Sequence, residues 1–297
     1  MPTREQSIME AVRVYYNHPQ TLRKFSLWAP DPKRPGVSAA HMGLNDVERF
    51  HKDVVRRTLD ILRHRKAVER MTKFIVAEAQ VASGHLVLDS GCGTGAVTFP
   101  IAEQNPRSLV FGISLSHGQL EAAQGYQQSA GIKNTFFSEQ DFTKMAFRDN
   151  SLDRVIFVES FCHAADKKAT ILEVNRVLKP GGKLIIFDAM YDRAPSDEHR
   201  HLCDALGSTD GLAMPDLPVV ADIVEFINGT DLETEHLLNL TPKIKASLAL
   251  IANGYITSLL EGRAEPSPVI DSYLAWHLLT AQGPLGYAVI RAVKSSN

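Results

Sequence analysis

The stretch LVLDSGCGTGAVTFPIAEQ, residues 86–104, decides the fold of this chain of 297 residues. Its first five residues have the composition of a short buried strand, and AVTFPIAEQ has that of a helix. Between them, Gly91, Gly93 and Gly95 let the backbone turn sharply and approach a ligand, while the helix start offers unpaired N–H groups. The unit predicts a nucleotide-like ligand; the alternative is a plain strand–helix turn. A pyrophosphate is disfavoured, because the dinucleotide fingerprint needs glycine where Ala96 stands.

The same alternation of strands and helices continues along the chain. Stretches of helical composition, such as residues 117–130, separate most of the β-rich runs. Near-continuous apolar strands that alternate with helices are typical of a parallel sheet covered on both faces. The predicted fold is therefore α/β, with a mostly parallel sheet of seven strands. These strands are expected at 86–90, 108–114, 134–140, 152–160, 182–190, 232–240 and 286–294.

The chain is predicted to have an N-terminal helical cap at 1–80 and a sheet domain at 81–297. Within the sheet domain, lid elements are expected at 190–220 and 241–282. The apolar residues of these elements suit a greasy pocket, although a packed lid core needs the same residue types. They include Met190, Tyr191, Leu212, Met214, Phe226, Leu248, Ile251, Tyr255, Tyr273 and Trp276.

The composition excludes several classes of partner. The net charge of -2 favours neither nucleic acid nor an anionic membrane surface. Cys92, Cys162 and Cys203 are too few and too far apart for a disulfide framework. Neither a signal peptide nor an apolar run long enough to span a membrane is visible, so a cytoplasmic protein is expected. The sequence leaves the formation of a homo-oligomer open.

Several motifs in the chain resemble those of class I S-adenosylmethionine-dependent methyltransferases. VLDSGCGTG at 87–95 resembles their first motif, RVLKPGGKLIIFD at 176–188 their late helix–turn–strand, and FRDNSLDRVIF at 147–157 the approach to their fourth strand. The resemblance implies a Rossmann-like fold and S-adenosyl-L-methionine as the cofactor. It also implies that the first motif binds this cofactor through Asp89, Gly91, Cys92, Gly93 and Gly95.

The second strand ends in ISLSHGQL, residues 113–120, which lacks the acidic residue that many members use to bind ribose. This run resembles the branch of sterol, tocopherol, cyclopropane-fatty-acid and geranyl diphosphate C-methyltransferases. The resemblance implies that Ser114 and Gln119 bind the ribose, with the Leu115 backbone alongside; both side chains donate and accept hydrogen bonds. In EQDF, 139–142, it implies that Asp141 meets the adenine amino group while Gln140 and Phe142 flank the ring.

The stretch VESFCHAAD, residues 158–166, follows the fourth strand, whose carboxyl end faces the ligand side of such a sheet. Three interpretations compete: a capped strand end, a metal site or the floor of an active site. A metal site is disfavoured, because zinc needs about four ligands and only Cys162 and His163 are neighbours. The stretch resembles the acid, small residue, Cys-His-Ala segment of sterol C-methyltransferases. Glu159 is thus a candidate to stabilise a carbocation and to contact the cofactor, and His163 a candidate to accept its proton.

The N-terminal part resembles the same branch through VYYNHP at 14–19, FSLW at 25–28 and SAAHMG at 38–43. Tyr15 or Tyr16 is a candidate for a catalytic cation–π contact with the sulfonium. The alternative is that the two rings pack in the core.

Together these features predict a methyltransferase of natural-product biosynthesis that acts on a small, largely apolar molecule. The favoured reaction is C-methylation of an isoprenoid or prenyl double bond through a carbocation, with rearrangement or cyclisation as an accompanying step. O- or N-methylation of a small metabolite is the alternative, and a catalytically silent binding protein is a third reading.

Overall fold

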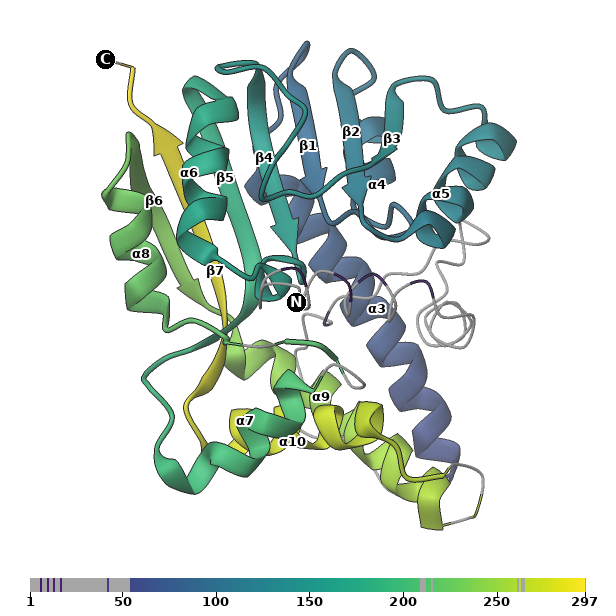
Figure 1. Cartoon of the computed structure of the whole chain (residues 1–297). Coiled ribbons are helices and arrows are strands. Elements are labelled where there is room, and N and C mark those ends of the chain that lie inside the picture. The colour runs from purple at the N-terminus through teal and green to yellow at the C-terminus, as the bar shows by residue number, and fades with distance from the viewer. Residues whose placement is uncertain are drawn as a thin grey trace.

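The strands predicted from the sequence form one sheet of seven, in the order β3-β2-β1-β4-β5-β7-β6 (Figure 1). The computed structural model describes residues 54–296 apart from 209–211, 215, 261, 263 and 264, with side chains from residue 64 onward except at 282. Before residue 54 it describes Gln6, Glu10, Arg13, Asn17 and Met42.

The first five strands pair in parallel, and the last two pair antiparallel with the edge of that array. The predicted mostly parallel α/β fold is therefore confirmed. The strands are β1 Leu86–Ser90, β2 Leu109–Ser114, β3 Thr135–Glu139, β4 Leu152–Val158, β5 Leu178–Tyr191, β6 Leu232–Asn239 and β7 Leu285–Lys294.

Both faces of the sheet are buried at its central strands, which explains why these strands are apolar nearly throughout. In β1, Val87 and Leu88 are both fully buried but belong to different clusters, because successive strand residues point to opposite faces. The Val87 cluster includes residues of α3, Val54–Ala79, and α4, Thr98–Gln104. The Leu88 cluster includes residues of α6, Lys167–Val177, and α8, Val220–Asn228.

The helices α5, His117–Ala130, and α6 begin at side-chain caps that the sequence places just before them. Ser116 Oγ accepts the Gln119 N–H at 3.3 Å, and Asp166 Oδ1 accepts the Ala169 N–H at 2.8 Å. Each cap satisfies a backbone donor that the first turn leaves unpaired. The cap of α5 also fixes the direction in which this helix leaves β2.

Three helices gather beyond the carboxyl ends of the parallel strands: α7 Arg200–Gly207, α9 Thr241–Leu260 and α10 Pro268–Gln282 (Figure 1). α10 contacts both of the others. These helices lie in the segments predicted as lid elements, whereas α8 contacts β6 and α6. The predicted N-terminal cap, residues 1–80, contains α3 in its last third. Most of the residues before α3 lie outside the described part of the chain.

Candidate active site

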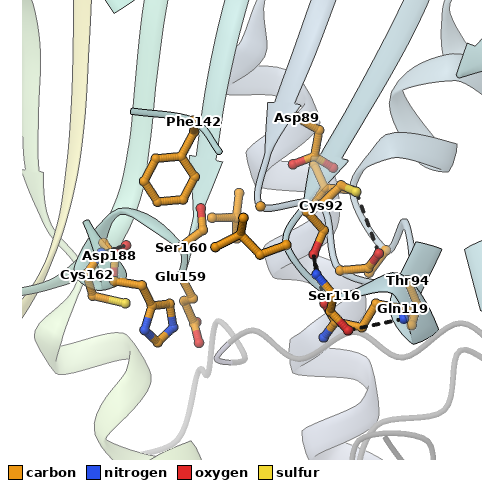
Figure 2. A pocket seen from close by; sticks show the side chains of 18 of the residues that line it. Asp89, Cys92, Thr94, Ser116, Gln119, Phe142, Glu159, Ser160, Cys162 and Asp188 are labelled. Carbon is orange, nitrogen blue, oxygen red and sulfur yellow. Dashed lines mark hydrogen bonds between the residues drawn. The ribbon is translucent and has the colours of Figure 1, made fainter. Parts of the chain in front are cut away.

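A cavity lies at the carboxyl ends of β1, β2, β4 and β5, where the strand order reverses between β1 and β4. The loops after β1, β2 and β4 line it, together with residues after α7 and on α10. In Figure 2, Cys92 and Gln119 lie on one side of the cavity, and Glu159, Cys162 and Asp188 on the other. The lining residues are Asp89, Gly91, Cys92, Gly93, Thr94, Ala96, Val97, Ser114, Leu115, Ser116, Gln119, Phe142, Val158, Glu159, Ser160, Cys162, His163, Asp188, Leu212, Met214, Tyr273 and Trp276.

The glycine loop after β1 needs glycine for two different reasons. All three glycines have positive φ: 80° at Gly91, 54° at Gly93 and 89° at Gly95. A Cβ on Gly91 would lie 2.4 Å from the Cβ of Ser160, so the loop after β1 closes directly on the loop after β4. A Cβ on Gly93 would meet nothing nearer than Gln119 Nε2 at 4.0 Å, which leaves the backbone open to a ligand.

Gly95 does not belong to the cavity lining, although it was predicted to contact the cofactor. A Cβ there would lie 2.5 Å from the ring of Phe99 on α4. The residue is therefore explained by close packing between the loop and the helix. Its contact with a cofactor stays a prediction.

The two residues predicted to bind ribose lie together. Ser114 and Gln119 are each 8% exposed, and Ser114 Oγ donates to Gln119 Oε1 at 3.2 Å. Ser114 Oγ also accepts the Ser116 N–H at 3.1 Å. Gln119 Nε2 lies 4.0 Å from the point where a Cβ of Gly93 would stand, and both residues line the cavity. This pair fits the hydroxyl groups of a ribose.

Asn17 reaches the same loop from the N-terminal part of the chain, and the sequence-based prediction assigned it no role. Its Oδ1 accepts the Ser116 hydroxyl at 2.9 Å and the Gly118 N–H at 3.2 Å. Asn17 thus joins Ser116 in capping α5. Its place in VYYNHP, beside the predicted Tyr15 and Tyr16, was the only signal in the sequence. Tyr15 and Tyr16 themselves lie outside the described residues.

Of the three predicted adenine contacts, only Phe142 lines the cavity. Asp141 Oδ1 accepts the Thr143 N–H and hydroxyl, both at 2.7 Å, in a local turn. Gln140 Nε2 donates to Ser138 Oγ at 2.8 Å, and Gln140 Oε1 accepts the Ala146 N–H at 2.9 Å. Both side chains are therefore engaged next to the cavity, and their contact with adenine stays a prediction.

Glu159 lies at the turn between β4 and the short helix η1, Phe161–His163, in a left-handed backbone conformation with φ of 50°. Its Oε1 accepts the Met42 N–H at 2.6 Å and the Tyr287 hydroxyl at 2.9 Å. Burial raises the pKa of this carboxyl to about 8, against the lowering effect of both hydrogen bonds, and Asp188 adds to the rise. Glu159 is therefore mainly protonated at neutral pH while no cation is near.

His163 is buried, with its Nδ1 2.9 Å from the carbonyl oxygen of Ala213. Since a carbonyl only accepts, Nδ1 must carry the hydrogen, and Nε2 keeps the lone pair of a base. Burial lowers the pKa of His163 to about 4, so the ring is neutral at physiological pH. The structure thus brings Glu159 and His163, the two predicted catalytic residues after β4, to one cavity.

Hydrogen bonds with two side chains, Asp188 and Lys167, hold the backbone of the η1 turn that carries His163. Asp188 Oδ2 accepts the Cys162 N–H at 2.9 Å, and Lys167 Nζ donates to the carbonyl oxygens of Cys162 at 3.0 Å and Ala164 at 2.5 Å. Asp188 also lines the cavity, and burial raises its pKa to about 6. The prediction missed Asp188 as a site residue. Its position at the end of the strand GKLIIFD was the signal that could have found it.

Beyond His163, the cavity wall is mostly apolar and comes from the lid elements. Leu212 and Met214 follow α7, while Tyr273 and Trp276 lie on α10 with their rings stacked at 6.4 Å. Trp276 is 4% exposed. This wall provides an aromatic and thioether surface for an apolar molecule.

Among the residues that the structure describes, no group of three or more His, Cys, Asp and Glu side chains could hold a metal ion. Within the same part of the chain, none of the helices is long and apolar enough to cross a bilayer.

Residues 82–214 match the family model of a methyltransferase domain. The methyltransferase GfsG of Streptomyces halstedii is 36% identical over 124 residues, which are 41% of this chain and 44% of the relative. The sterol 24-C-methyltransferase ERG6A of Gibberella zeae is 31% identical over 173 residues, 58% of this chain and 45% of the relative. This chain thus matches a little under half the length of these curated relatives.

Among solved structures, a geranyl diphosphate C-methyltransferase from Streptomyces coelicolor A3(2) superimposes with a TM-score of 0.77 at 17% identity. The match covers 99% of this chain and 100% of that one. Its crystals contain Mg²⁺, geranyl-S-thiolodiphosphate and S-adenosyl-L-homocysteine. At this level of identity the likeness establishes the shared fold.

Proposed function

We propose, from the premise that this chain contains a class I, S-adenosylmethionine-dependent methyltransferase domain, that the protein methylates a carbon of an alkene in a small apolar acceptor. The acceptor class is an isoprenoid or prenylated metabolite. S-adenosylmethionine supplies an electrophilic methyl group, and the demethylated thioether leaves. The proposal includes the assignment of Ser114, Gln119, Phe142 and the glycine loop to the cofactor.

The observation that carries the proposal is the pairing of a neutral, buried imidazole with a half-buried carboxyl at one largely apolar cavity. When the π electrons of an alkene form the new C–C bond, a positive charge develops on the neighbouring carbon. Glu159 offers negative charge to that carbon once its proton has left. Nε2 of His163 takes the proton that the cation must lose to restore a double bond.

The acceptor would lie against Leu212, Met214, Tyr273 and Trp276. An acceptor held against this apolar wall would be shielded from water, which would otherwise trap a carbocation as an alcohol. The aromatic faces of Tyr273 and Trp276 also favour a positive charge. Support for this part of the proposal also comes from the sterol and geranyl diphosphate C-methyltransferases among the related proteins.

O- or N-methylation is the second candidate, because the same Nε2 could deprotonate a hydroxyl or an amine. The deciding experiment supplies isotopically labelled methyl donor and a panel of prenylated indoles, sterols, prenyl diphosphates and phenols. Label found in a C–CH3 group supports the proposal. Label found only on oxygen or nitrogen contradicts it and leaves the second candidate.

A further inference from the structure

Two carboxyls, the half-buried Glu159 and the buried Asp188, line the cavity, and the hydrogen-bond donors that reach them from the described residues are neutral. Asp188 accepts the N–H groups of Cys162 and Ala189, at 2.9 and 2.8 Å. Glu159 accepts the Met42 N–H and the Tyr287 hydroxyl. Neither carboxyl has a salt bridge to a described residue. A buried carboxylate without a counter-ion is unstable relative to its protonated form.

The groups that face Glu159 from neighbouring elements do not supply the missing positive charge. The Cys162 thiol and the His163 ring belong to η1, and burial keeps both neutral. It raises the pKa of the thiol and lowers the pKa of the imidazole. From β7 comes the phenol of Tyr287, and from β5 comes Asp188.

Among the described residues, Lys167 on α6 is a cation close to Asp188, and its charge favours the carboxylate form of Asp188. Its Nζ donates to two backbone carbonyls of the η1 turn rather than to Glu159. Among the described residues, the cavity lining contains neither Lys nor Arg. The described part of the lining thus offers Glu159 no counter-ion, and a cationic ligand in the cavity would supply one.

We propose that Glu159 releases its proton when the positively charged methyl donor binds and keeps it when the demethylated product binds, so that this one carboxyl selects donor over product. This inference rests on the proposed function, because it takes the cavity as the S-adenosylmethionine site. The two ligands share their adenosine and amino-acid parts and differ by one methyl group and one unit of charge at sulfur. Because Glu159 lines the cavity, this unit charge would stabilise its carboxylate form.

The sign of the pH effect follows from linkage. In the free protein the pKa of Glu159 is about 8, and a bound sulfonium lowers it. Below pH 8, donor binding must therefore expel a proton, so donor affinity rises with pH and levels off above that value. Affinity for S-adenosylhomocysteine does not depend on this group. If the bound pKa falls well below 6.5, the ratio of the two affinities rises by about 25-fold between pH 6.5 and 8.5.

The test is titration calorimetry of the full chain with each ligand, in pairs of buffers that differ in ionisation enthalpy. At pH 7 the donor should release about 0.9 proton more than the product, and at pH 9 this excess should fall to about 0.1. The sulfonium also lowers the pKa of the donor's own amino group, so the proton assigned to Glu159 is the part of the excess that Glu159→Gln removes. Equal proton counts for the two ligands at pH 7 would overturn the inference.

Glu159→Gln should abolish the excess proton and flatten the affinity ratio. Glu121→Gln, which changes an exposed carboxyl on α5 with 68% of its side-chain surface accessible, should leave both unchanged. An excess that persists in Glu159→Gln would assign the proton to another group and refute the role of Glu159. If that variant does not fold, the wild-type proton counts decide by themselves. Failure of both ligands to bind the wild type would instead contradict the proposed function.

Discussion

Substitution of single glycines separates the two reasons for which the loop after β1 needs them. Gly131, at the end of α5, shares their left-handed conformation with φ of 68°, but a Cβ there would meet no atom within 4 Å. Gly131→Ala therefore measures the conformational cost alone, about 1–2 kcal/mol. Gly93→Ala adds a methyl group that meets no protein atom nearer than 4.0 Å, so its unfolding free energy should fall by the same amount.

Gly91→Ala should cost more. Its Cβ would lie 2.4 Å from Ser160 Cβ, and Ser160 is held because its Oγ donates to the Ser90 carbonyl at 2.6 Å. Relief of the clash must move the loop that carries Glu159. Overpacking of this kind costs about 1–3 kcal/mol, for a total of about 2–5 kcal/mol with the conformational cost.

Urea denaturation and calorimetry with S-adenosylhomocysteine check these values together. Gly131→Ala should keep the ligand affinity of the wild type. Gly93→Ala should lose affinity at least tenfold although it is no less stable than Gly131→Ala, because its methyl group occupies the space of the ligand. If Gly93→Ala binds like the wild type, the loop does not approach the ligand and the reasoning is refuted. If Gly91→Ala is as stable as Gly131→Ala, the close contact with Ser160 is wrong.

Three further predictions concern the catalytic groups and the N-terminal part. His163→Ala should reduce turnover by ~10²–10⁴ with little change in cofactor affinity. In the wild type, His163 should become protonated, and turnover should fall for this reason, only as the pH approaches 4. A pH–rate profile checks this. Burial raises the folded-state pKa of Glu159 from 4.5 to about 8, so its stabilising contribution is complete below pH 4.5 and lost as pH rises through 8. The ligand-free wild type should therefore lose unfolding free energy over this range relative to Glu159→Gln, as measured by denaturation at several pH values. Deletion of residues 1–24, which contain Tyr15 and Tyr16, should lower turnover far more than the melting temperature; equal loss of both would indicate a structural role.

The sequence predicted the sheet and the glycine loop because both depend on local patterns. Val87 and Leu88 each meet a covering layer of helices, which makes the strand apolar throughout, and the left-handed turns at Gly91 and Gly93 need a residue without a side chain. Ser114 and Gln119 lie five positions apart across one strand–helix turn, so the resemblance of one short motif was enough to predict both.

Other features of the site depend on contacts between distant parts of the chain. The hydroxyl of Tyr287 reaches Glu159 from a residue 128 positions away, and Asn17 reaches Ser116 across 99 positions. No local pattern encodes such pairs. Asp141 shows that a local motif can also predict a contact incompletely. The motif predicts a contact with the ligand, but the N–H of Thr143 already donates to one oxygen of the Asp141 carboxylate. A side chain that can cap its own turn offers only part of its hydrogen-bonding capacity to a ligand.

The left-handed backbone conformation of Glu159 places its carboxyl at the cavity. A glutamate with φ of 50° is costly, since only glycine adopts that conformation freely. Here the Glu159 N–H donates to the Phe187 carbonyl of β5 at 2.8 Å, so the backbone beyond β4 is held in register with its neighbour. The side chain is thereby turned to Tyr287 and Met42, among neutral donors. A glycine would relieve the backbone and a glutamine would avoid the buried acid. The proposed positive charge of the ligand or transition state would offset both costs of a glutamate at this position.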